Sequence, residues 1–217
     1  MVRRPWFDYS FLAVGLVIQV VTYWTTNNLA PQSLAPLSLI SGLLGVCSVC
    51  LAAQGRILTF AFGFAQVGTY TYLCVTQRFY GEIAINAYYF ITMIYGVYAW
   101  KKRLSVSAEQ VVKPRSLVRR SLLLIVVGTL AVSWLTGWGL ATWTDDTQPY
   151  LDAYTTIPAL VAQVLMILVY REHWFLWLAV DVLSVVLWLR AGDYCMAAQY
   201  AFWCANCVYG LFRWKNL

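Results

Sequence analysis

The sequence predicts an all-α integral membrane protein with eight transmembrane helices: two parallel three-helix repeats, a linker helix between them, and one extra N-terminal helix. Composition, the distribution of basic residues and an internal repeat support this prediction. Of 217 residues, 61% are hydrophobic and 11% are charged, and the mean hydropathy is +0.65. A helix of about 20 apolar residues crosses the bilayer core. Segments of this kind lie at residues 7–24, 36–53, 57–76, 81–100, 120–140, 152–170, 173–189 and 194–212.

The predicted spans place nearly all basic residues on one side of the membrane. Only Arg78 and Arg190 fall in the loops on one side, and the positive-inside rule assigns the opposite side, with both termini, to the cytoplasm. A seven-span alternative without the first segment keeps the same sidedness. The net charge of +6 therefore reflects the orientation of the chain in the membrane. It gives no reason to expect binding to nucleic acid. The cytoplasmic set is Arg3, Arg4, Arg56, Lys101, Lys102, Arg103, Lys113, Arg115, Arg119, Arg120, Arg171, Arg213 and Lys215.

The chain also repeats itself. Residues 95–101 read YGVYAWK and residues 209–215 read YGLFRWK, an offset of 114. Gln66 aligns with Asp181 at an offset of 115, which a one-residue difference in an outer loop reconciles. Internal repeats are typical of transporters, with the substrate site near the midplane between them.

The repeat divides the chain into four parts. Residues 1–34 form a peripheral N-terminal transmembrane helix, and residues 35–103 form the first three-helix repeat. Residues 104–148 hold a basic cytoplasmic loop and the linker helix, and residues 149–217 form the second repeat. The linker helix restores the starting side of the membrane, so the two repeats run parallel.

An acidic residue inside a membrane span is the strongest functional signal. Asp181 lies within the apolar run of residues 174–189, where a charge costs roughly 2.5–3.5 kcal/mol on insertion scales. Trp174 and Trp177 precede it at positions that share one helix face. Two indoles and a carboxylate suit an aromatic cation, through stacking, cation–π attraction and counter-charge.

Other polar or aromatic residues are candidates for lining the same pathway, although each also has a structural interpretation. Embedded hydroxyls commonly bond neighbouring helices, and aromatic stripes commonly pack. Glu82 can instead pair with Arg78 near the outer surface, and Asp152 is either a solvated residue or an acid gating the mouth of the path. The candidate substrate-binding residues are Asn86, Gln66, Gln163, Tyr89, Phe90, Glu82 and Ser48.

Several other features carry less weight. Two Cys-x-x-Cys pairs, at residues 47–50 and 204–207, have metal or redox spacing but lack a supporting histidine, so buried inert thiols are expected. His173, the single histidine, is expected at the interface. One histidine and no cluster of cytoplasmic acids argue against an enzyme acting on lipid. A purely structural protein explains neither Asp181 nor the repeat.

Two motifs resemble those of the Pnu family of bacterial vitamin transporters. One is Asn86-Ala-Tyr-Tyr-Phe-x4-Tyr95-Gly96-x-Tyr98-x-Trp100, and the other is Trp174-x-x-Trp177-x-x-x-Asp181. The resemblance covers about residues 42–214. It implies a homotrimer in the bacterial inner membrane that takes up a water-soluble vitamin by facilitated diffusion. A cytoplasmic kinase then traps the vitamin inside the cell. No cofactor is implied, and no phosphate-binding glycine-rich loop is present.

The vitamin itself is the finer question. The resemblance implies Asn at the position of Asp181 in members that carry nicotinamide riboside, and neutral amides serve a ribosyl pyridinium well. Carboxylates at Asp181 and Glu82 suit the aminopyrimidine of thiamine, so the sequence favours thiamine over nicotinamide riboside. A proton-coupled carrier with Asp181 as the proton site is a further alternative.

Overall fold

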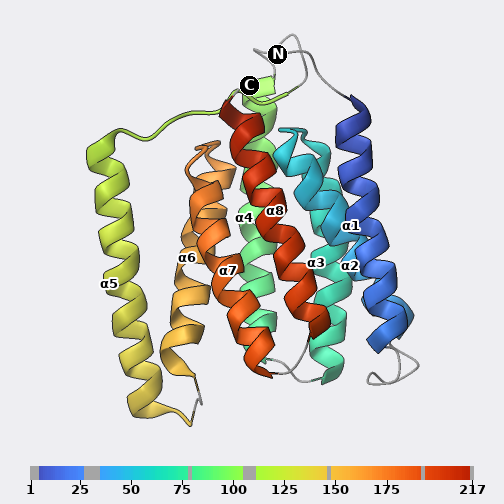
Figure 1. Cartoon of the computed structure of the whole chain (residues 1–217). Coiled ribbons are helices and arrows are strands. Elements are labelled where there is room, and N and C mark those ends of the chain that lie inside the picture. The colour runs from blue at the N-terminus through green and yellow to red at the C-terminus, as the bar shows by residue number, and fades with distance from the viewer. Residues whose placement is uncertain are drawn as a thin grey trace. The chain divides into compact units, whose positions relative to one another are not determined.

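The structure is a computed structural model that describes residues 5–26, 35–77, 80–104, 111–145, 148–191 and 194–215. Eight α-helices occupy these ranges, as predicted (Figure 1). Five of them are long and apolar enough to cross a membrane, namely α1, α2, α4, α5 and α6, and α7 holds a shorter apolar stretch, His173–Leu187. The helices are α1 Pro5–Thr26, α2 Ala35–Ala53, α3 Leu58–Gln77, α4 Tyr80–Leu104, α5 Arg119–Trp143, α6 Pro149–Ile167, α7 His173–Ala191 and α8 Tyr194–Lys215.

Helix α6 is displaced from its predicted span by three residues at each end. It starts at Pro149 because proline favours the first helical turn, where its missing N–H costs no hydrogen bond. Asp152 therefore lies in that first turn, where an acid interacts favourably with the helix dipole. The helix ends at Ile167, just before Val169 adopts a φ of 62°.

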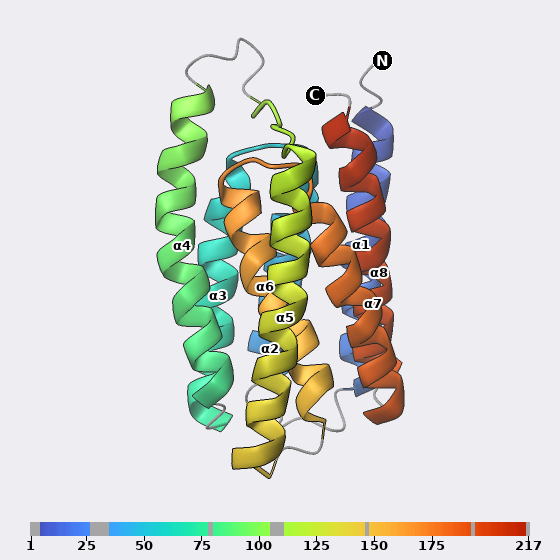
Figure 2. The ribbon, with the colours of Figure 1, turned by 90° about the vertical axis from the view of Figure 1, so that its left-hand side faces the viewer.

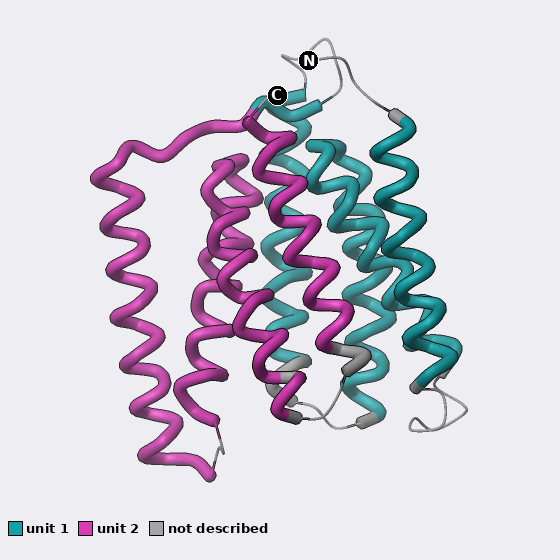
Figure 3. The backbone as a smooth tube through the Cα atoms, in the orientation of Figure 1, with its two compact units in different colours: residues 1–113, 216–217 teal, residues 114–215 magenta. Residues whose placement is uncertain are grey.

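The chain divides into two compact units, residues 1–113 with 216–217 and residues 114–215 (Figure 3). In the first, α1 packs on α2, α2 on α3 and α3 on α4; in the second, α5 packs on α6, α6 on α7 and α7 on α8. Within each unit, consecutive helices alternate in direction (Figures 1 and 2). Each unit therefore contains one of the predicted three-helix repeats and one further helix.

Equivalent contacts inside the two units reproduce the 114-residue repeat. Phe60 meets Trp100 edge-on at 5.1 Å between ring centroids, and Trp174 meets Trp214 edge-on at 5.9 Å. Each pair joins the start of one helix to the end of the next. The same offset holds at the preceding turns, where Gly55 has a φ of 69° and Val169 has a φ of 62°. The offset of 114 thus extends to α3 and α7, which places Val67, and not Gln66, at the position equivalent to Asp181.

Short backbone contacts hold both turns. Val112 N–H donates to the Gly55 carbonyl at 3.1 Å, and Arg115 N–H donates to the Val169 carbonyl at 2.7 Å. The Arg115 guanidinium also lies over the Tyr170 ring, 4.8 Å from its centroid. The segment between α4 and α5 therefore supplies a backbone donor to the turn in each unit.

Replacing Gly55 with Ala should lower the free energy of unfolding by about 1–2 kcal/mol, since an L side chain is strained at positive φ. Gly128 is the matched control: it lies inside α5, and a Cβ added there meets no atom within 4 Å. The Gly128→Ala variant should be neutral or more stable by about 0.5–1 kcal/mol. Thermal unfolding of both variants in detergent measures the difference. Equal effects at the two glycines would refute the conformational explanation.

Candidate functional site

The Asp181 carboxylate lies inside the second unit, on the α7 side of the α7–α8 pair. Its residue is 3% exposed, and Cys207 on α8 donates its S–H to Asp181 Oδ2 at 3.3 Å. Within the described ranges, no Lys, Arg or His forms an ion pair with Asp181. A buried carboxylate without a cationic partner is costly, which makes Asp181 the candidate residue for binding a cationic ligand.

The register of α7 against α8 follows from two contacts. Trp174 lies level with Trp214, and Asp181 lies level with Cys207, as expected for antiparallel neighbours. The contacts place residues 174 and 181 of α7 against residues 207, 210 and 214 of α8. Helical spacing extends these stripes to residues 177 and 184 on α7 and to residue 203 on α8. This spacing of three and four residues places one stripe of each helix against the other.

Trp174 and Trp177 have different surroundings, although the sequence placed them on one face. Trp174 is 3% exposed, and a Cβ on Gly210 would lie 2.5 Å from its Cε2 atom. The Trp174 indole thus packs directly against the α8 backbone, and its Nε1 has no hydrogen-bond partner within the described residues. Trp177 is half-buried, one turn from Asp181, which leaves part of its ring accessible to a ligand.

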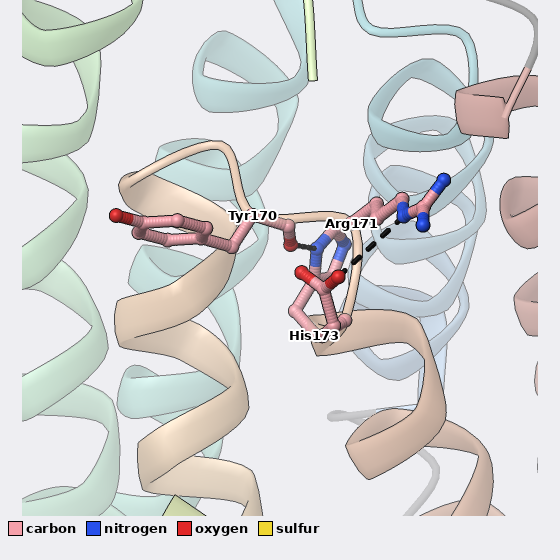
Figure 4. Close-up of polar contacts among 4 residues, drawn as sticks. Tyr170, Arg171 and His173 are labelled. Carbon is pink, nitrogen blue, oxygen red and sulfur yellow. Dashed lines mark hydrogen bonds and ion pairs between the residues drawn. The ribbon is translucent and has the colours of Figure 1, made fainter. Parts of the chain in front are cut away.

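His173, expected at the interface, is fully buried and is the first residue of α7. Its Nδ1–H donates to the Tyr170 carbonyl at 2.7 Å, since a carbonyl can only accept (Figure 4). Its ring also lies 4.4 Å from that of Trp174 and 4.6 Å from that of Trp214, between centroids. Beside it, Arg171 Nε pairs with Glu172 Oε1 at 3.5 Å. His173 therefore anchors the start of α7 within an aromatic cluster.

The candidates in the first unit include two amides and a hydroxyl that joins two helices. Asn86 is buried, and Gln66 is half-buried beside Gly45. Ser48 and Thr59 instead bond α2 to α3 reciprocally, each hydroxyl donating to the other residue's carbonyl at 2.9 Å. Ser48 thus has the structural function that embedded hydroxyls commonly have.

The remaining candidates are aromatic or lie nearer the helix ends. Tyr89 is half-buried, whereas Phe90 is 46% exposed and meets Phe64 edge-on at 5.2 Å. In the second unit, Gln163 is buried in α6 and Asp152 is half-buried in its first turn. The side chain of Glu82 lies outside the described residues.

Sequence reasoning missed Cys207 and Trp203. Cys207 is buried, as expected of these thiols, but the sequence does not show that it contacts the Asp181 carboxylate. Trp203 lies one turn before it on the same stripe of α8, and its buried Nε1 has no hydrogen-bond partner within the described residues. The three- and four-residue spacing along residues 200–214 was the available signal, but the register against α7 was needed to interpret it.

A bundle of apolar helices with a predicted three-helix repeat, and with a buried carboxylate that has no ion-pair partner among the described residues, is typical of membrane transporters of small solutes. The model of one family, described as nicotinamide mononucleotide transporter, matches residues 35–216, and the chain belongs to this family of membrane vitamin transporters. The matched range begins at the first residue of α2 and leaves out α1.

Named relatives and a solved structure agree with this assignment. The chain is 33% identical to a protein of Neisseria mucosa named nicotinamide riboside transporter PnuC, covering 97% of this chain and 81% of the relative. It is 32% identical to the PnuC of Haemophilus influenzae, covering 97% and 90%. A crystal structure titled vitamin B3 transporter PnuC superposes with a TM-score of 0.78 at 28% identity, covering 97% of this chain and 91% of the other.

Proposed function

We propose that the protein carries nicotinamide riboside across the membrane by facilitated diffusion. The observation that carries this proposal is the buried Asp181 carboxylate beside the half-buried Trp177, in a chain whose relatives are named nicotinamide riboside transporters. These names favour nicotinamide riboside, the second choice from the sequence, over thiamine.

The chemistry of the ligand fits the residues around Asp181. Nicotinamide riboside has a pyridinium ring with one positive charge, a carboxamide and ribose hydroxyls. The ring can stack on the Trp177 indole, and its charge can be balanced by Asp181. In the same unit, the buried amide of Gln163 can donate to and accept from the hydroxyls.

The rest of the proposal follows the family. The protein acts as a homotrimer in a bacterial inner membrane, with both termini in the cytoplasm. Transport runs down the gradient of the free vitamin, and phosphorylation inside the cell keeps that gradient.

Binding and uptake of three vitamins test the substrate. Purified protein is titrated with nicotinamide riboside, thiamine and riboflavin, with tryptophan fluorescence as the readout. Nicotinamide riboside should bind most tightly, and its entry into proteoliposomes should continue after a protonophore is added. Tighter binding of thiamine would contradict this proposal and support thiamine as the substrate, as the sequence favours. Uptake abolished by the protonophore would replace facilitated diffusion with proton coupling.

A further inference from the structure

The contact between Cys207 and Asp181 is a polar pair buried between two helices. Both residues are 3% exposed, and the thiol is the one described hydrogen-bond donor to the carboxylate. The bond occupies Oδ2 and leaves Oδ1 without a hydrogen bond from any described residue. A carboxylate held at one oxygen keeps a fixed rotamer, and its other oxygen is free to face a ligand.

The first unit shows that packing does not require this polar pair. At the 114-residue offset, Asp181 corresponds to Val67 and Cys207 corresponds to Met93, which are 5% and 6% exposed. An apolar pair therefore fills the same level between α3 and α4. At this level, the polar pair occurs only in the second unit, and it includes Asp181, the charged residue of the candidate site.

The two units also differ in which helix of the pair carries the larger side chain. In the first, a Cβ on Gly63 would lie 2.9 Å from Met93 Sδ, so a small residue accommodates a large one. In the second, the equivalent residues are Trp177 and Cys207, so the large residue stands on α7 and the small one on α8. The smaller side chain of this pair is thus on α8, at the residue that donates to Asp181.

The Cys207 contact differs from the local contacts that many threonines make in this chain. Hydroxyls on the helices of this chain often bond back to their own helix, as Thr69 does to the Ala65 carbonyl and Thr92 to the Tyr88 carbonyl. The Cys207 thiol instead reaches across to α7.

We propose that Cys207 is a positioning residue for transport: its thiol orients the Asp181 carboxylate toward the cationic ring of the ligand. This inference rests on the proposed function and adds to it a residue that acts through Asp181 without touching the ligand.

A double-mutant cycle tests the proposal on the full-length protein. Cys207→Ala should weaken the binding of nicotinamide riboside about three- to tenfold, as expected for losing a weak donor to a charged group. In an Asp181→Val background, which carries the residue found at the equivalent position of the first unit, the same change should cost nothing further. Cys204→Ala is the matched control, because Cys204 lies one turn away on α8 and has no described hydrogen bond to Asp181.

The uncharged, reduced form of nicotinamide riboside separates positioning from packing. Cys207→Ala should leave its affinity unchanged, because the neutral ring does not need the counter-charge. Equal losses for both forms, or equal losses with and without Asp181, would overturn the positioning role. A wild-type protein that fails to bind nicotinamide riboside would refute the proposed function itself. Normal binding by the wild type with an unaltered Kd for Cys207→Ala would refute only this inference.

Discussion

Replacing Asp181 with Asn should weaken the binding of nicotinamide riboside by about tenfold to somewhat over a hundredfold, or about 1.5–3 kcal/mol. The expected loss is specific to this chain, because its carboxylate supplies a counter-charge that the Asn implied for other carriers of this vitamin lacks. The substitution keeps an acceptor oxygen and nearly the same volume while it removes the charge. Because Asp181 is buried and has no described cationic partner, the ligand's pyridinium would supply the missing positive charge. Titration of the purified variant, followed by tryptophan fluorescence, measures the change in Kd.

The exposed Asp145, in the loop after α5, provides the matched control. Asp145→Asn removes the same charge from the surface, where it is screened by water and salt, and should leave the Kd unchanged. A folded Asp181→Asn variant with wild-type affinity would show that Asp181 is a structural acid and would place the counter-charge elsewhere.

The Trp177→Ala variant should bind nicotinamide riboside about five- to thirtyfold more weakly, which corresponds to the loss of about 1–2 kcal/mol of cation–π and stacking energy. Trp177 lies one turn from Asp181 and is half-buried, so its ring can contact a ligand that pairs with the carboxylate. Ligand-induced quenching of tryptophan fluorescence should also fall in this variant, because the quenched indole is removed.

Trp143, 75% exposed at the end of α5, is the control for this experiment. Trp143→Ala should change neither the Kd nor the amplitude of the fluorescence that the ligand quenches. If Trp177→Ala bound normally and retained full quenching, stacking would have to be assigned to another indole, and Trp203 on α8 would be the first to examine.

The helices could be predicted from the sequence because each one depends on local composition. All eight predicted segments are helical, and most of their bounds differ from the structure by only a few residues. Helix α6 illustrates the limit: its predicted span opens at Asp152, whereas the helix starts at Pro149 and holds Asp152 in its first turn. Apolar runs indicate the body of a helix, but its ends depend on caps and turns.

The candidate site was predictable only in part. Asp181 stood out because a charge within an apolar run has a large energetic cost wherever the helix lies. Trp174 and Trp177 looked equivalent in sequence, yet the α8 backbone at Gly210 covers the first and leaves the second half-buried. Helical spacing shows which residues share a face, but it does not show which neighbour covers that face.

The sequence by itself determined the membrane class, the eight helices, the repeat and the buried acid, because hydropathy and charge act through the local environment of each segment. Only the tertiary structure decided the register of α7 against α8, which brings Cys207 to Asp181 and places Val67 and Met93 at the equivalent level of the first unit. The physical reason is that the register between two helices depends on the shapes of side chains far apart in the chain. Small residues such as Gly210 and Gly63 set that register by admitting a large neighbour.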